Sequence, residues 1–406
     1  MNDNNQHIPS GYKPSPLGII PEDWEVKRLG EIGEVLMCKR IMKYQTDSCG
    51  DIPFFKIGTF GGKPDAYISK EVFDEYKTKY SYPKVGDVMI SAAGTIGRSV
   101  IFDGTPSYYQ DSNIVWIDND NKQVLNKYLY YYYSTINWIT DTGTIPRLYN
   151  GALKAIQIPM PPIEQQKRIV SILEFWDTAI AKQTALIEQL TLRKRGLMQQ
   201  LLTGKKRLKG FEGEWKRIKA GEIFKSISVK GNGSEVLLSA TQEHGVIPRD
   251  QLEGRVTMPT GNTNSFKLVE VGDFVISLRS FQGGLEYSEH RGIVSPAYTV
   301  LKPIIEIDKS FYRYYFKSAE FIGHLAIAVI GIRDGKQISY EDFCFVKIPY
   351  PNIKEQKTIS SVLLQADKEI EIQKQKLAAM QAQKKGLMQV LLTGKKRVRA
   401  DRRVCP

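Results

Sequence analysis

An internal repeat of 50 residues constrains this chain more than any other feature. Segments 158–207 and 348–397 align without a gap at an offset of 190 positions, and 24 of the 50 positions are identical. The ends agree best, with IPxPxIxxQK at the start and GLMQxLLTGKKR at the finish. Chance does not produce such agreement, so the chain contains a duplication, and both copies are expected to fold alike.

Each copy predicts a long helix with a coiled-coil seam. Prolines stand at the start of both copies, and none follows within them. From residue 169 in the first copy and 359 in the second, apolar residues recur in alternating steps of four and three. Such a helix would run for about 39 residues, or roughly 60 Å. The simplest partner for each seam is the other copy, in antiparallel orientation.

Two polar residues interrupt the seam at the same places in both copies. The first is a glutamine, Gln183 or Gln373, and the second is a lysine, Lys194 or Lys384. A polar seam residue costs stability but can fix register and partner. A glycine closely follows each lysine, and glycine inside a helix costs about 1 kcal/mol. We therefore expect the seam to fray at the lysines.

The repeats divide the chain into four parts. These are a first variable domain (1–157), a helical segment (158–209), a second variable domain (210–347) and a second helical segment (348–406). The fold class expected is α+β, with two mixed α/β domains separated by a long two-helix antiparallel coiled-coil spacer and related by a pseudo-two-fold repeat.

The variable domains share only landmarks, such as Val85-Gly86-Asp87 and Val271-Gly272-Asp273. An aromatic run follows in each domain, for which core packing is favoured over stacking on unpaired bases. Short apolar stretches bounded by Gly or Pro predict strands. The strand candidates are Val88–Ser91, Asn113–Ile117, Phe274–Leu278 and Tyr298–Leu301.

The net charge of +13 lies wholly in the helical segments. Segment 158–209 carries +6 and segment 348–406 carries +8, whereas the two variable domains carry −1 and 0. Basic clusters attract phosphate backbones. A solvated helix end, or a surface that docks an acidic protein, explains the same charge equally well.

Polar and basic residues in Gly-rich loops of the variable domains are the candidates for reading DNA. Arginine can pair bidentately with guanine, and glutamine or asparagine with adenine. For any single residue, an ordinary solvated loop remains the favoured alternative. The candidates are Thr95, Arg98, Gln110, Asn113, Thr144, Arg147, Arg279, Ser280, Gln282, Arg333, Lys336 and Gln337.

Catalytic motifs are missing from the sequence. It has no GxxxxGK[ST], no GxGxxG opening a helix, no DPPY-like tetrapeptide and no HExxH. Residues 21–27 imitate a nuclease PD…ExK motif, but the ligands of such a site lie on separate strands, farther apart. We therefore expect a binding and positioning module without a metal site.

The remaining composition indicates a reduced, cytoplasmic protein. Four scattered cysteines form no CxxC pair, which argues against a zinc ribbon and against a disulfide scaffold. No apolar run reaches the roughly 18 residues of a membrane span. Residues 1–13 have neither the cationic start nor the apolar core of a secretion signal, so we expect none there.

The duplicated IPxPxIxxQK…GLMQxLLTGKKR segments resemble the two conserved regions of type I restriction-modification specificity subunits. Residues 21–30 and 210–215 are similar to the starts of that family's two target-recognition domains. The resemblance implies a non-catalytic subunit that reads a bipartite double-stranded DNA target, one half with each domain, while the paired helices act as a spacer.

The same resemblance implies partner subunits. Two methyltransferase subunits would methylate adenine with S-adenosylmethionine, and restriction motor-nuclease subunits would use ATP and Mg²⁺, so that no cofactor belongs to this chain. The basic repeat segments would then be docking surfaces. The residues expected there or in the spacer are Gln166, Lys167, Gln183, Lys205, Lys206, Arg207, Gln356, Lys357, Gln373, Lys395, Lys396 and Arg397.

The two copies differ at points that bear on docking. The second has Asn352 where the first has Pro162, and Lys354 where the first has Glu164, so docking at the two ends is expected to differ. Two other classes of protein stay open as alternatives. One is a stand-alone DNA nuclease or methylase, and the other is a coiled-coil protein adaptor with no DNA role.

Overall fold

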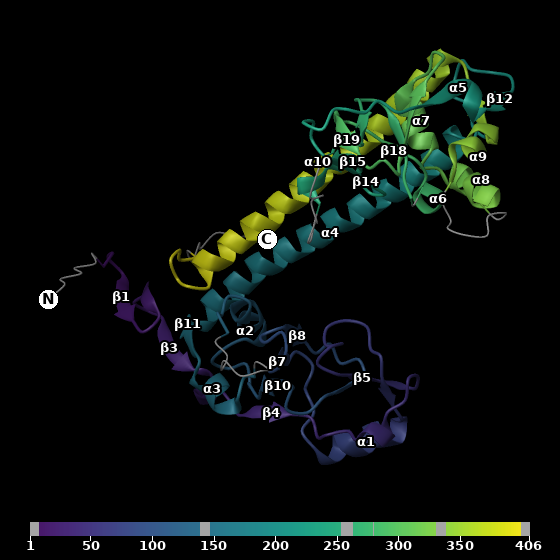
Figure 1. The fold of residues 1–406 in the computed structure, drawn as a ribbon. Coiled ribbons are helices and arrows are strands. Elements are labelled where there is room, and N and C mark those ends of the chain that lie inside the picture. Colours follow the sequence, from purple (N-terminus) through teal and green to yellow (C-terminus); the bar gives the residue numbers. More distant parts are fainter. Residues whose placement is uncertain (1–7, 139–146, 253–262, 279, 330–337, 399–406) are drawn as a thin grey trace. The chain divides into compact units, whose positions relative to one another are not determined.

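The structure is a computed structural model that describes residues 8–138, 147–252, 263–278, 280–329 and 338–398. The chain forms two compact units. The first comprises Met1–Lys182 with Leu377–Pro406, and the second comprises Gln183–Lys376. Two helices of 39 residues contribute to both units, namely α4 (Ile163–Leu201) and α10 (Ile353–Leu391). The predicted helix length is thus confirmed (Figure 1).

The first unit builds its variable domain around a four-stranded antiparallel sheet in the order β4-β10-β7-β8. A three-stranded sheet, β6-β5-β9, and the hairpin β1-β2 accompany it. The elements are β1 (Tyr12–Ser15), β2 (Gly18–Pro21), β3 (Glu25–Arg28), β4 (Val35–Met37), β5 (Ile52–Phe55), β6 (Tyr67–Ile68), α1 (Lys70–Lys79), β7 (Val88–Ser91), β8 (Ser99–Ile101), β9 (Tyr108–Tyr109), β10 (Ile114–Ile117), α2 (Asn126–Tyr133), α3 (Asn150–Ala155) and β11 (Gln157–Met160).

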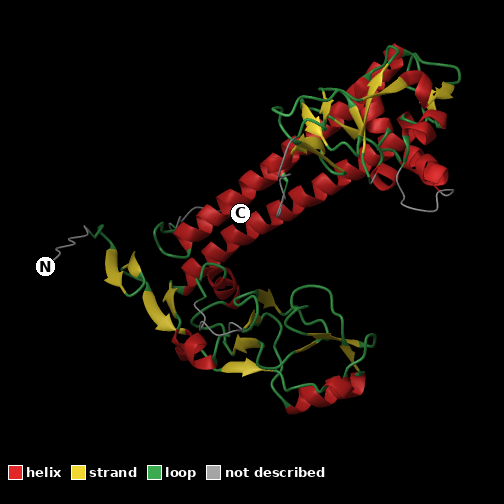
Figure 2. Cartoon of the chain, in the orientation of Figure 1, coloured by secondary structure: helices red, strands yellow, loops and turns green. Residues whose placement is uncertain are grey.

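The second unit repeats the central sheet, in the order β13-β20-β17-β18, and adds the two-stranded pairs β14-β15 and β16-β19. Figure 2 shows strands in yellow and helices in red in both units. Its elements are β12 (Lys216–Lys219), α5 (Ala220–Ile223), β13 (Phe224–Ile227), β14 (Leu238–Thr241), β15 (Gly245–Pro248), β16 (Lys267–Val269), β17 (Phe274–Ile276), α6 (Ser280–Gly283), β18 (Glu286–Tyr287), β19 (Gly292–Val294), β20 (Thr299–Pro303), α7 (Lys309–Tyr315), α8 (Ala319–Val329), α9 (Tyr340–Phe345) and β21 (Lys347–Tyr350).

A two-stranded antiparallel sheet closes each variable domain where its long helix begins. In the first unit β3 pairs with β11, and in the second β12 pairs with β21. Prolines follow β11 and β21 directly and prevent the helix from starting earlier. The first and last segments of each variable domain therefore meet beside the first turn of α4 or α10.

The aromatic runs are core, as the sequence favoured. Tyr128 and Tyr133 in α2 are fully buried, and so are Phe311, Tyr312 and Tyr315 in α7. Each run packs against the start of one long helix and the end of the other within its own unit. The four predicted strands are present as β7, β10, β17 and β20, with ends shifted by one to two residues in the last three.

The shared Val-Gly-Asp landmark is a tight turn before the central strand. Gly86 and Gly272 adopt φ values of +92° and +90°, a region that favours glycine. The carboxylates of Asp87 and Asp273 each accept a backbone N–H three residues earlier, at 2.8 Å. Burial raises the pKa of both carboxyl groups. The repeat of this motif is therefore explained by backbone geometry.

The expected fold class is confirmed: two mixed α/β domains accompany two long helices. Within the second unit the helices run antiparallel, because Gln183 of α4 contacts Gln373 of α10 while Lys194, farther along α4, pairs with the earlier Asp367.

Candidate nucleic-acid interface and spacer contacts

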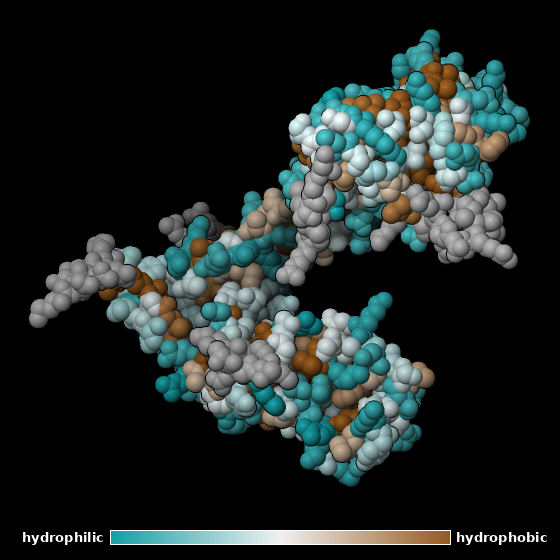
Figure 3. Space-filling model, viewed as in Figure 1, coloured by the Kyte–Doolittle hydropathy of each residue, from teal (hydrophilic) through white to brown (hydrophobic). Residues whose placement is uncertain are grey.

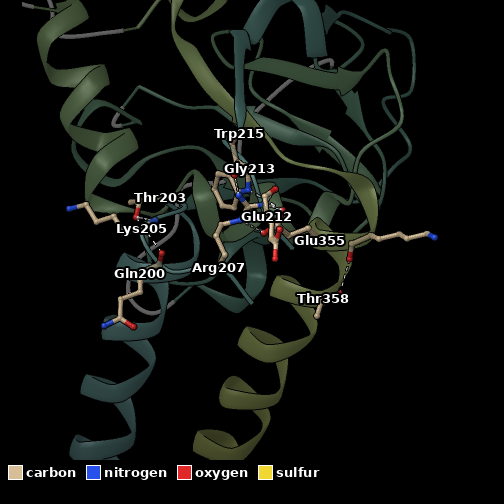
Figure 4. A network of polar contacts seen from close by, with 10 residues as sticks. Gln200, Thr203, Lys205, Arg207, Glu212, Gly213, Trp215, Glu355 and Thr358 are labelled. Carbon is tan, nitrogen blue, oxygen red and sulfur yellow. Dashed lines mark hydrogen bonds and ion pairs between the residues drawn. The ribbon is translucent and has the colours of Figure 1, made fainter. Parts of the chain in front are cut away.

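A buried ion pair ties the loop after α4 to the first turn of α10 in the second unit. Arg207 Nε and Nη2 donate to the two carboxylate oxygens of Glu355 at 2.6 and 2.8 Å. Trp215 Nε1 donates to the same carboxylate at 3.0 Å, and Glu355 is only 1% exposed. Figure 4 shows Arg207 between Glu355 and the loop that carries Gly213 and Trp215. We expected Arg207 at a docking surface or in the spacer, but its side chain makes an internal contact.

The equivalent junction of the first unit has its carboxylate at a different position. Gln165 occupies the place of Glu355 and accepts from Trp24 Nε1 at 2.9 Å. Arg397, the counterpart of Arg207, donates to Asp23 at 2.9 Å, and Asp23 also accepts from Gln165 at 2.6 Å. Asp23 belongs to the segment that imitates a nuclease motif, and here its carboxylate holds the junction.

The seam lysine of α10 has two partners in the first unit. Lys384 forms an ion pair with Asp177 of α4, and its ammonium lies 5.2 Å from the ring centroid of Tyr131 in α2. Tyr131 Oη donates to the same carboxylate at 2.6 Å. Burial and the neighbouring carboxylate raise the pKa of Tyr131, so the phenol remains the donor.

The second unit repeats this cluster with the roles of the helices exchanged. Lys194 of α4 pairs with Asp367 of α10 and lies 5.2 Å from the ring centroid of Tyr314 in α7. Tyr314 Oη donates to Asp367 at 2.5 Å. The expectation of fraying is wrong, because both helices continue through the following glycine to their ends. The ion pair and the cation–π contact offset the cost of a lysine in the seam.

The four glutamines that we expected at the docking surfaces or in the spacer form hydrogen bonds with the backbone or with each other. Gln183 Nε2 donates to Oε1 of Gln373 at 2.8 Å. Gln166 accepts the N–H of Leu125 and donates to the carbonyl of Pro161. Gln356 makes the same two contacts, with Asp308 and Pro351. Gln166 and Gln356 have no exposed surface, so each fixes its domain to the helix start.

The exposed lysines of the repeat remain open to solvent. Lys167 pairs with Glu164 one turn earlier. Single apolar residues such as Phe175 and Leu192 are also exposed on α4. The face seen in Figure 3 is mostly hydrophilic, with small separate apolar patches. The other exposed lysines on our list are Lys205, Lys206, Lys357, Lys395 and Lys396.

In the first unit, two DNA candidates are exposed on the loop between β7 and β8. Arg98 donates to the carbonyl of Phe60 at 2.9 Å, and Thr95 lies on the same loop. Arg147 is exposed too; its backbone bridges to Ala93, and its guanidinium lies 5.8 Å from the ring centroid of Tyr149. The structure therefore gathers Thr95, Arg98 and Arg147 around one loop.

Two further candidates in this unit flank a tight turn before β10. Gln110 accepts the N–H of Ile57 at 2.9 Å, which directs its amide into the fold. Asn113 accepts the N–H of Ala92 through its backbone carbonyl at 2.7 Å. Both side chains are half-buried.

In the second unit, the two candidates in α6, Ser280 and Gln282, differ in exposure. Ser280 is buried, and its Oγ accepts the N–H of Ser277 at 2.8 Å, so it stabilises the turn and has no surface to offer a base. Gln282 is exposed. Thr144, Arg279, Arg333, Lys336 and Gln337 lie outside the described residues.

Beside α6 lies a cavity of about 640 Å³ that the sequence did not predict. The hairpin β14-β15 supplies part of its wall, including the exposed side chains of Gln242 and His244, and Ser277 and Tyr298 supply more. To predict this hairpin from the sequence, one would have to recognise that β14 and β15 pair across a tight turn. The duplication gives no help, because the residues of this turn do not repeat in the first variable domain.

Two kinds of feature are absent from the described residues. No group of three or more His, Cys, Asp or Glu side chains there could hold a metal ion. No helix there is long and apolar enough to cross a membrane.

Several known proteins are similar to this chain. A putative type I restriction enzyme specificity subunit of Haemophilus influenzae is 64% identical over 168 residues, which span 41% of this chain and 44% of that protein. The putative MjaX specificity subunit of Methanocaldococcus jannaschii is 28% identical over 96% of this chain and 97% of its own length.

Solved structures share the fold at low identity. The S subunit of a type I restriction-modification system from M. genitalium has a TM-score of 0.52 at 16% identity and covers 91% of this chain and 96% of its own. A chain from a study of type I R-M complex assembly and conformational transition has a TM-score of 0.58 at 16% identity, over 93% and 99%.

A family model described as the type I restriction modification DNA specificity domain matches residues 21–192 and again residues 212–382. The two matches together cover most of the chain and follow its internal repeat. The protein therefore belongs to the type I restriction-modification DNA specificity family, as a specificity subunit without catalytic activity of its own.

Proposed function

We propose that this subunit reads a two-part duplex DNA target, one half with each variable domain, and holds the two halves at a fixed separation. The observation that carries the proposal is the contrast within the duplication. Both domains have the same central sheet, the same closing sheet and an equivalent Tyr–Asp–Lys contact with α4 and α10, whereas their exposed loops differ in sequence. A shared scaffold with different loops suits one task performed on two different sequences.

The proposal includes partners that carry the chemistry. Two adenine methyltransferase subunits, using S-adenosylmethionine, and restriction motor-nuclease subunits, using ATP and Mg²⁺, would dock on the repeat segments of this cofactor-free subunit in the cytoplasm. The exposed lysines at the ends of the two repeats support such docking, because they remain on the surface while Arg207 and Glu355 form the internal pair.

The test is to co-express this chain with the methyltransferase subunit encoded beside it and to map methylated adenines by direct sequencing of the DNA. We expect one split motif with a constant gap. The methyltransferase subunit expressed alone is the control, and it should leave DNA unmodified. Stable co-purification without methylation would count against DNA reading. Metal-dependent cleavage by the purified chain alone would contradict the non-catalytic role.

A further inference from the structure

The Tyr–Asp–Lys clusters are polar contacts common to both units, and each of them involves three helices. In the first unit, Tyr131, Asp177 and Lys384 come from α2, α4 and α10. In the second unit, the same three residue types come from α7, α10 and α4. Each cluster therefore joins one variable domain to both long helices at a single point.

The lysines and tyrosines of these clusters are mostly buried, whereas the side chains of Asp177 and Asp367 are 46% and 41% exposed. The side chains of Lys384 and Lys194 are 17% and 22% exposed, and both tyrosines are 5% exposed. An apolar seam residue still finds apolar neighbours after a helix slides. An ammonium held between one carboxylate and one ring does not, because a slide of one turn moves it by about 5.4 Å. The clusters thus distinguish one helix register from its neighbours.

Stability alone is a poor explanation for these lysines. Replacing a partly buried ion pair with apolar residues is often neutral or stabilising. The middle of the repeat has diverged widely, yet Asp177 and Asp367 occupy equivalent positions, as do Lys194 and Lys384. Retention of both charges in both copies fits a role in geometry better than a role in folding.

We propose that Tyr131–Asp177–Lys384 and Tyr314–Asp367–Lys194 are positioning clusters, which seat each variable domain on the helix pair and lock the register of the two helices. The consequence would be that the complex accepts only one separation between its two half-sites. This inference rests on the proposed function, since it concerns how the gap between half-sites is set.

The experiment uses the full subunit co-expressed with its methyltransferase partner. Plasmids carry the two mapped half-sites separated by the wild-type gap, or by a gap one base pair shorter or longer. The variant is Lys194→Met combined with Lys384→Met, which leaves an apolar residue in each seam position. We expect its preference for the wild-type gap to fall about tenfold, as expected for a loss of about 1.4 kcal/mol of discrimination. The half-site sequences should be unchanged. The Tm of the complex should be equal to that of the wild type or higher.

Two matched variants complete the design. Lys182→Met with Lys374→Met makes the same change at exposed positions of the same helices and should keep the wild-type gap preference. Lys194→Arg with Lys384→Arg keeps both charges and should keep most of the wild-type gap preference. A Lys194→Met/Lys384→Met protein with unaltered gap preference would overturn the proposal. Equal loss of methylation at every gap, with a lowered Tm, would also overturn it and leave only a structural role.

The outcomes of this experiment distinguish a failure of DNA reading from a failure of the positioning role. If the subunit does not read split DNA targets, the wild-type complex itself will show no methylation or no gap preference, and both proposals fall. If only the positioning role is wrong, the wild type will prefer one gap and the variant will match it.

Discussion

Arg207 and Arg397 occupy equivalent positions of the repeat but meet carboxylates in different surroundings. Glu355 is 1% exposed, whereas the side chain of Asp23 is 36% exposed. We expect Arg207→Met to lower the free energy of unfolding of the second unit by about 3–5 kcal/mol, because it leaves a buried carboxylate without its cation. Arg397→Met should cost about 1 kcal/mol or less. Denaturant unfolding followed by tryptophan fluorescence measures both, and equal losses would contradict this account.

The buried carboxyl of Asp273 gives a pH dependence of known sign. Burial raises its pKa in the folded protein above the ordinary value of 3.8, so the folded state binds the proton more tightly than the unfolded state. The resulting contribution to stability is present below the ordinary pKa and is lost as the pH rises through the folded pKa. Asp273→Asn does not titrate and retains an acceptor for the N–H of Glu270. Its stability relative to wild type should therefore increase from pH 4 to pH 7, as followed by urea unfolding. A constant difference across that range would refute the assignment.

Single residues were predictable only where the duplication made them visible. Gln183 and Lys194 recur in the second copy within a stretch that has largely diverged, and each makes an interhelical contact. Ser280 and Gln282 looked equivalent in the sequence. Only the packing of α6, which the sequence does not reveal, buries Ser280 and leaves Gln282 exposed. Loop chemistry without the fold could not separate a turn-stabilising hydroxyl from an exposed amide.

At the scale of elements, the prolines and the heptad pattern predicted both helices to the correct length. The pattern could not predict that the lysine positions remain helical, because the compensating carboxylates and tyrosines come from other elements. The central sheets were harder to predict. Their edge strands are only two to four residues long, too short for an alternating pattern to stand out.

The helix pair predicts how the spacing of the target should respond to helix length. Deleting residues 182–188 together with 372–378 removes one heptad from each helix and leaves the seam facing inward. The spacer should shorten by about 10 Å, which corresponds to roughly 3 base pairs of duplex DNA. Methylation mapping should then find the same half-sites with a shorter gap. Deleting the heptad from α4 alone is the control, and it should abolish methylation, because the two helices then differ in length by one heptad and can no longer make the contacts of both ends together. An unchanged gap in the double deletion would contradict the spacer role.

At the scale of the whole molecule, each unit repeats the Tyr–Asp–Lys contact with the roles of α4 and α10 exchanged. Asp177 of α4 pairs with Lys384 of α10 in the first unit, and Asp367 of α10 pairs with Lys194 of α4 in the second. The closing sheets β3-β11 and β12-β21 give both variable domains the same attachment to the helix that follows. These contacts are therefore shared symmetrically by the two units, whereas the junctions of Arg207 and Arg397 and the exposed loops differ between them.

This symmetry predicts the target of a chain with two identical variable domains. Replacing residues 215–347 with a second copy of residues 24–157 keeps Trp24 and Trp215 in equivalent places and preserves both closing sheets. Because the helix pair is antiparallel, the two identical domains should read the same half-site on opposite strands. The methylated motif should then become an inverted repeat of the first half-site. The control is the wild-type chain, whose two half-sites differ. An asymmetric motif from the duplicated chain would show that the repeat segments themselves contribute to sequence reading, since the two variable domains would be identical.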